Sequence, residues 1–117
     1  MTASPLADLT ERLRGFAAER DWEQFHSPKN LAMALVAEAG ELAAEFQWLS
    51  EQESAAPAPE RLARIRAEAA DVLSYLVRLA DKLGFDLVAA AREKMAENER
   101  RYPADRVRGS ARKHTEY

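Results

Sequence analysis

A chain of 117 residues, 47% of them hydrophobic and 32% charged, has the composition and length of one globular domain. It has no cysteine, which excludes disulfides, thiolate catalysis and cysteine-ligated zinc. A formal net charge of −3 argues against a nucleic-acid partner, and no apolar run approaches the roughly 20 residues of a membrane span. Residues 1–8 lack the basic start and apolar centre of a signal peptide, so we expect a cytoplasmic protein.

Helical periodicity runs through the chain, and serine–proline pairs give the expected starts of the first two helices. Ser4-Pro5 and Ser27-Pro28 each combine an N-cap with a proline in the first turn. The first helix should reach about residue 19 or 20, and the second should run from about 28 to 49.

A loop at residues 54–59 separates these helices from a third, expected over about 60–83. Gly84 is well placed to end it, Asp86 can cap a fourth helix, and Pro103 should stop that helix close to Tyr102. The third helix carries a stripe of apolar residues at steps of three and four, which predicts a buried face. The stripe consists of Leu62, Ile65, Ala69, Val72, Leu76, Leu79 and Leu83.

These elements predict an all-α protein, either a four-helix bundle or four helices that complete a bundle by pairing with another chain. No segment shows the alternation of a strand. Residues 1–103 form the expected helical domain, and residues 104–117 form a polar, basic tail.

Two pairs of carboxylates stand out, each three residues apart on one helix face. Glu38 and Glu41 lie on the second expected helix, and Glu68 and Asp71 lie on the third. Both pairs border the apolar stripe of their helix, which on the second helix consists of Leu31, Leu35, Leu42, Phe46 and Leu49. If the two helices face each other, four negative charges meet beside a core and repel unless a cation joins them. Carboxylate oxygens suit Mg²⁺ or Mn²⁺.

Other interpretations of the acids are weaker. As ordinary salt-bridge partners they would indicate a non-catalytic helical interaction module, but such helices usually carry a cation four residues on. Those positions here are Leu42, Glu45, Val72 and Tyr75. A ferritin-like di-iron site needs two Glu-x-x-His motifs, and the chain has one, at residues 23–26 in a connector.

Segments around the acid pairs resemble the MazG-like, all-α NTP pyrophosphohydrolase superfamily, whose mark is E-x-x-E, a spacer and E-x-x-D. They are NLAMALVAEAGELAAEFQW at residues 30–48 and EAADVLSYLVRL at residues 68–79. Residues 16–30, 94–103 and 110–117 are similar to the dCTP pyrophosphatase branch. The resemblance implies that Mg²⁺, or Mn²⁺ in its place, binds at the four acids, which are also the catalytic set.

The activity implied is hydrolysis of dCTP or a modified dCTP between the α and β phosphates, giving a monophosphate and pyrophosphate, in a homotetramer or, failing that, a dimer. A broader or dUTP-preferring enzyme is the alternative. Leu13 stands where some relatives carry a histidine near the base, which leaves the preferred base open. Glu45, one turn beyond Glu41, is a further ligand or base, or a surface acid.

The resemblance also implies contacts to the substrate. The residues for the base are Trp22, Trp48, Tyr75 and His26. From composition alone, the tryptophans would be core or interface residues, and the histidine a surface or capping residue. The residues for the phosphates are Lys94, Asn98, Arg101 and Tyr102, with Arg112 and Lys113 as candidates to close the site. Lys94, Asn98 and Arg101 share one helix face. The alternative interpretation is that this face is simply exposed to solvent.

Overall fold

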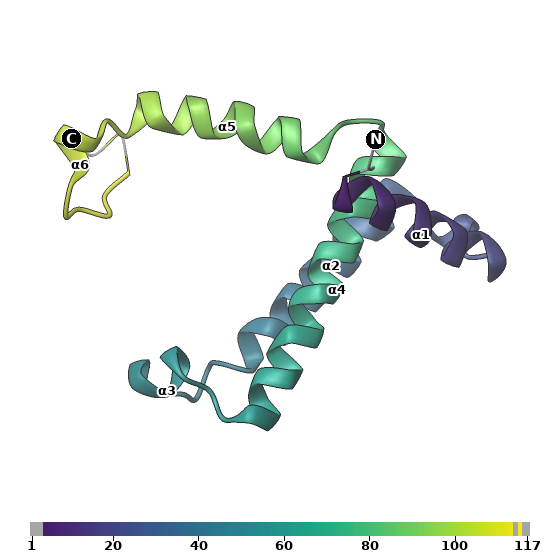
Figure 1. The fold of residues 1–117 in the computed structure, drawn as a ribbon, viewed down its shortest axis with the longest axis horizontal. Coiled ribbons are helices and arrows are strands. Elements are labelled where there is room, and N and C mark those ends of the chain that lie inside the picture. Colours follow the sequence, from purple (N-terminus) through teal and green to yellow (C-terminus); the bar gives the residue numbers. More distant parts are fainter. Residues whose placement is uncertain (1–3, 114, 116–117) are drawn as a thin grey trace. The chain divides into compact units, whose positions relative to one another are not determined.

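The computed structural model describes residues 4–113 and 115, and the described residues form helices and connections without a strand (Figure 1). The all-α prediction is confirmed. In chain order the elements are α1 (Pro5–Glu19), the 3-10 turn η1 (Glu23–Phe25), α2 (Pro28–Ala44), α3 (Glu51–Ala55), α4 (Pro59–Leu83), α5 (Leu87–Arg101) and α6 (Ala104–Val107). No helix among the described residues combines the length and apolar character needed to cross a membrane.

The contacts divide the chain into two compact units, Met1–Gly84 and Phe85–Tyr117, and each is described by itself. A domain at residues 1–103 with a tail at 104–117 stays a prediction. The expected tail begins with the short helix α6, and residues 114, 116 and 117 of it lie outside the described residues.

The expected N-caps are confirmed. The hydroxyl of Ser4 accepts a hydrogen bond from the backbone N–H of Ala7 at 3.1 Å, and the hydroxyl of Ser27 accepts one from Asn30 at 3.1 Å. Asp86 caps α5 in the same way, accepting from Ala89 at 2.9 Å. Each cap satisfies a donor that the first helical turn leaves free, which is why these helices begin where the sequence indicates.

The second helix ends at Ala44, before the expected end near residue 49. The backbone N–H groups of Glu45, Phe46 and Leu49 bond to carbonyls three residues back. Arg61 donates to the Glu45 backbone carbonyl at 2.6 Å. A capping box then starts α3, because the Ser50 hydroxyl accepts from the N–H of Glu53 while the Glu53 carboxylate accepts from the N–H of Ser50. The short helix α3 therefore precedes the expected loop and overlaps its first two residues, Ser54 and Ala55.

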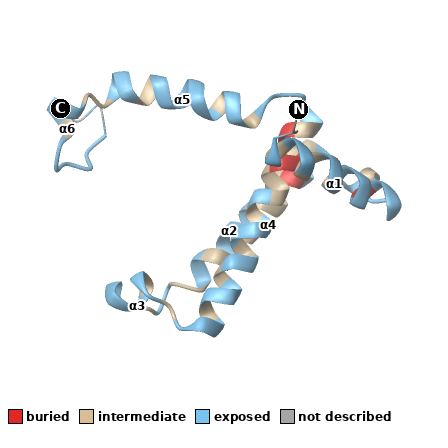
Figure 2. Ribbon diagram, in the orientation of Figure 1, coloured by how far each residue is buried: buried red, intermediate tan, exposed pale blue. Residues whose placement is uncertain are grey.

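In the first unit, α2 and α4 lie side by side and run antiparallel, and α1 packs on α4 (Figure 1). The buried residues lie on the last turns of α4, near the end of α1 and at the start of α2 (Figure 2). They are Ala17, Leu31, Val77, Arg78 and Ala80. The expectation of a fully buried stripe along the third helix was wrong for this chain by itself. Leu62 and Leu83 at its two ends are 44% and 56% exposed, because α1 and α2 cover only part of α4.

Gly84 ends α4 with φ of 73°, in the left-handed region that side chains with a Cβ avoid. We predict that Gly84→Ala lowers the free energy of unfolding by about 1 kcal/mol, since an added Cβ strains the backbone although it meets no atom within 4 Å. Gly15→Ala, inside α1 and equally open, should raise it by about 0.5 to 1 kcal/mol. Urea unfolding of both variants measures the difference, and effects of the same sign would contradict the prediction.

Candidate active site

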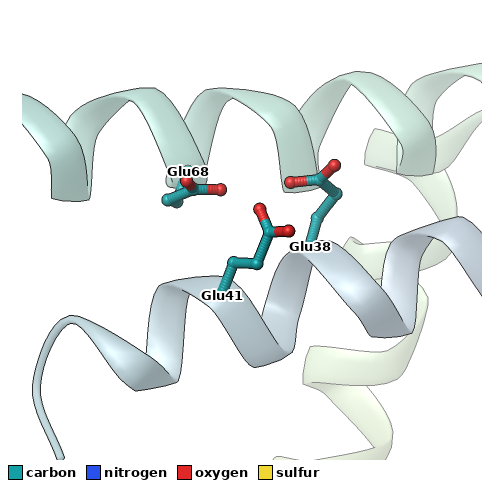
Figure 3. Close-up of side chains that lie close together, drawn as sticks. All are labelled: Glu38, Glu41 and Glu68. Atoms are coloured by element: carbon teal, nitrogen blue, oxygen red, sulfur yellow. The ribbon is translucent and has the colours of Figure 1, made fainter.

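Three of the four predicted metal ligands meet between α2 and α4. Glu38 and Glu41 come from one face of α2, and Glu68 comes from the facing side of α4 (Figure 3). One carboxylate oxygen of each residue lies within 4.8 Å of the other two. The spacing of three residues on α2 and the side-by-side packing of the two helices bring the three groups together.

The electrostatics of this carboxylate cluster, Glu38, Glu41 and Glu68, are unfavourable without a cation. The Oε2 atoms of Glu38 and Glu68 are buried and have no hydrogen-bond partner among the described residues. Burial, and then Glu41 and Glu38, raise the pKa of Glu68 to about 7. Burial, and then Glu41, also raise the pKa of Glu38 above its usual range, which Glu68 opposes. Ionised carboxylates only accept hydrogen bonds, so the orphaned oxygens fit a hard divalent cation.

Asp71 and Glu45 take different places. The carboxylate of Asp71 is exposed and stands outside the group of three, although its charge contributes to the raised pKa of Glu38. The carboxylate of Glu45 lies 3.0 Å from Arg64 Nε and 3.3 Å from Arg61 Nη1. Glu45 thus forms ion pairs with two arginines at the start of α4 and is not part of the carboxylate cluster.

A pocket of about 250 Å³ lies in the first unit beside Asp71. It is lined by Leu13, Phe16, Trp22, His26, Asp71, Ser74, Tyr75 and Arg78. The rings of Phe16 and Trp22 meet edge to face with centroids 5.6 Å apart, and the ring of His26 lies 6.4 Å from that of Trp22. Aromatic walls with a few polar groups are typical of a site for a planar ring.

Three of the four predicted base-contacting residues, Trp22, His26 and Tyr75, line this pocket, and Trp48 does not. Trp48 follows α2 and is 88% exposed in the single chain. Two polar residues that line the pocket, Ser74 and Arg78, were not predicted from the sequence. Arg78 carried a usable signal, since it is a lone arginine inside the apolar run Tyr75–Ala80.

The predicted phosphate-contacting residues belong to the second unit. On α5, Glu97 pairs with Lys94 Nζ at 3.3 Å and with Arg101 Nη2 at 2.6 Å, and these cations lower the pKa of Glu97. The backbone carbonyl of Asn98 accepts a hydrogen bond from the backbone N–H of Tyr102 at 2.8 Å. In the tail, Arg112 Nε donates to the Ser110 hydroxyl at 3.3 Å, and Lys113 is exposed.

Comparison with known proteins decides the family. A model of the MazG-like family matches residues 33–116. The chain belongs to the MazG-like family. It is 50% identical over 113 residues to dCTP pyrophosphatase 1 of Homo sapiens and to that of Mus musculus, covering 95% of this chain and 66% of each relative. The chain thus spans slightly less than two thirds of the length of those relatives.

The structure of a pyrophosphatase from Archaeoglobus fulgidus aligns with a TM-score of 0.82 and 36% identity, covering 88% of this chain and 96% of the archaeal one. The family match includes all four predicted metal ligands of this MazG-like chain. It begins at Met33, so Leu13, Trp22 and His26 in the pocket precede it.

Proposed function

We propose that this chain is a Mg²⁺-dependent pyrophosphohydrolase that cleaves dCTP or a modified dCTP between the α and β phosphates, giving dCMP and pyrophosphate. The observation that carries the proposal is the pair of buried, unpartnered oxygens of Glu38 and Glu68 in a three-carboxylate cluster close to an aromatic pocket. The names of its relatives support the same activity. A cytoplasmic location and a role in nucleotide-pool house-cleaning, the removal of unwanted nucleotides, belong to this proposal.

Glu38, Glu41 and Glu68 would hold the metal, with Asp71 as the fourth acid at the side of the pocket. When bound, Mg²⁺ supplies charge neutralisation for the triphosphate and lowers the pKa of a bound water. Manganese, which also prefers oxygen ligands, should substitute for it. The chain's own contribution is to hold three carboxylates at fixed positions on two packed helices, so that the cation is positioned before the substrate arrives.

The pocket would hold the base, with Trp22 and Tyr75 as flat walls and His26 as a polar contact. Asp71 lies at the border of the pocket on the same helix as Glu68, which suits a substrate whose phosphates extend toward the cluster. We assign the phosphate contacts to Lys94, Asn98, Arg101 and Tyr102, because an ammonium and a guanidinium bind phosphate oxygens well. Arg112 and Lys113 would close the site.

The same proposal includes a homotetramer, with a dimer as the simpler assembly. Large apolar side chains on and just after α2 are exposed in the single chain: Met33 is 64%, Val36 is 68% and Trp48 is 88% exposed. Exposed apolar groups of this kind are typical of an interaction surface. Light scattering after gel filtration measures the mass, and a monomer at micromolar concentration would contradict the assembly.

A broader base preference is the second candidate. It is favoured by Leu13, whose apolar side chain lines the pocket and offers no hydrogen bond to a base. Incubation with Mg²⁺ and a panel of canonical and 5-modified dNTPs, followed by ³¹P NMR of the products, tests both candidates. Pyrophosphate with a nucleoside monophosphate is the expected outcome. Orthophosphate as first product, or no release from any substrate, would overturn the proposal.

The raised pKa of Glu68 predicts how stability depends on pH without metal. Its pKa lies at about 7 in the folded protein against 4.5 ordinarily, so this group contributes stability that is fully present below pH 4.5 and lost as the pH rises through about 7. With a chelator present, we expect the melting temperature to fall between about pH 5 and about pH 8, and Mg²⁺ to restore it most at the upper end. Glu68→Gln should flatten the fall. A wild-type melting temperature independent of pH would contradict the assignment.

A further inference from the structure

Arg78 on α4 is the one buried charged residue among residues 4–113 and 115, with 4% of its surface exposed. Its Nη1 donates to Asp81 Oδ2 at 3.2 Å, and its Nη2 donates to Glu23 Oε1 at 2.8 Å. The same Nη2 lies 3.4 Å from Nδ1 of His26. Arg78 therefore connects α4 to the segment that carries two walls of the pocket, Trp22 and His26.

Both carboxylates that pair with Arg78 have a second cation. Arg14 on α1 pairs with Asp81 at 2.6 Å, and Lys82 pairs with Glu23. The ion pairs that join α1 and η1 to α4 would thus persist without Arg78. What Arg78 alone supplies is its contact with the imidazole of His26.

That contact selects one form of the imidazole. A guanidinium only donates hydrogen bonds, so Nδ1 of His26 must be the acceptor and the ring proton of the neutral form must sit on Nε2. Burial, and then the charge of Arg78, lower the pKa of His26, which Glu23 opposes and Lys82 reinforces. His26 is therefore neutral at physiological pH, with Nε2–H as its donor.

We propose that Arg78 is a positioning residue that fixes His26 as an Nε2–H donor at the pocket wall, where it binds an acceptor of a pyrimidine ring, the carbonyl oxygen at position 2 or an unprotonated ring nitrogen. The part that concerns the ring rests on the proposed function. The part that concerns the imidazole does not. A fixed donor binds a ring acceptor without first reordering its protons, and it disfavours a ring that presents a donor there.

The state of the imidazole can be read directly by long-range ¹H–¹⁵N NMR of the full-length protein, with His26→Gln identifying which of the two histidine signals belongs to His26. Wild-type protein should show the Nε2–H form near neutral pH. Arg78→Met should give a mixture of both tautomers and a higher His26 pKa. Arg14→Met removes one cation from the same set of ion pairs without touching His26, so its spectrum should match wild type. Nδ1–H in wild type, or equal changes in both variants, would overturn the proposal.

Kinetics separate the role in binding from a general loss of structure. Arg78→Met should raise KM for dCTP by about 3- to 10-fold, the range of one neutral hydrogen bond, and leave kcat within about twofold. Arg14→Met should leave both close to wild type. A fall in kcat with unchanged KM would contradict the positioning role. If the wild-type protein hydrolyses no nucleotide, the proposed function fails, whereas the NMR result still decides the imidazole assignment.

Discussion

Replacing Glu68 with glutamine should lower kcat for dCTP by at least about 100-fold. Glu68 supplies one of the two buried, unpartnered oxygens of the carboxylate cluster, and its amide counterpart carries no charge for a cation. A catalytic cation contributes several kcal/mol to the transition state, and about 3 kcal/mol corresponds to a hundredfold in rate. Steady-state release of pyrophosphate at saturating Mg²⁺ measures the loss.

Glu45→Gln is the matched control for this prediction. Glu45 lies four residues beyond Glu41 but bonds to Arg61 and Arg64, so its replacement should change kcat by less than about threefold while losing only partly exposed ion pairs. Equal losses in the two variants would mean that the acids of α2 and α4 act through stability. Circular dichroism of both proteins should show unchanged helix content.

Replacing Trp22 with alanine should raise KM for dCTP by about 5- to 100-fold with a small change in kcat, because stacking of one base on an aromatic ring contributes about 1 to 3 kcal/mol. Trp22 forms a wall of the pocket and contacts Phe16 edge to face. Substrate-dependence curves at fixed Mg²⁺ give both constants.

Phe25→Ala offers the comparison for Trp22. Phe25 lies in the same connector, in η1, and is 59% exposed without lining the pocket. The KM of Phe25→Ala for dCTP should stay within about twofold of the wild-type value. An unchanged KM in Trp22→Ala would place the base elsewhere, and a rise in both variants would indicate that the connector as a whole has moved.

Local rules predicted the helices well where a cap could be read from the sequence. Ser4, Ser27, Gly84 and Asp86 all act as expected, because capping depends on residues within one turn. The end of α2 failed because Arg61, sixteen residues away, bonds to the Glu45 carbonyl. The Ser50–Glu53 capping box that starts α3 is, in contrast, a local signal that can be read from the sequence alone.

The acid pairs could be predicted because spacing on a helix decides which side chains share a face, and Glu38, Glu41 and Glu68 do come together. The pocket could be predicted only in part. Trp22 and His26 are distinctive residues in the sequence. Arg78, in contrast, reaches Glu23 and His26 of the same connector across more than 50 residues of sequence. The exposure of Trp48 depends on which surface packs against it. The spacing of residues within one chain does not encode that surface.

Direct binding of Mn²⁺ tests, apart from any activity, whether the carboxylate cluster holds a divalent cation. Bound Mn²⁺ loses its sharp solution EPR signal, so a titration counts the sites. Wild-type protein and Glu45→Gln should bind with the same affinity, and binding should weaken as the pH falls below about 7, where Glu68 takes up a proton. A variant with both Glu38→Gln and Glu68→Gln should leave the free-ion signal undiminished. Binding that survives this double substitution would place the cation away from the carboxylate cluster.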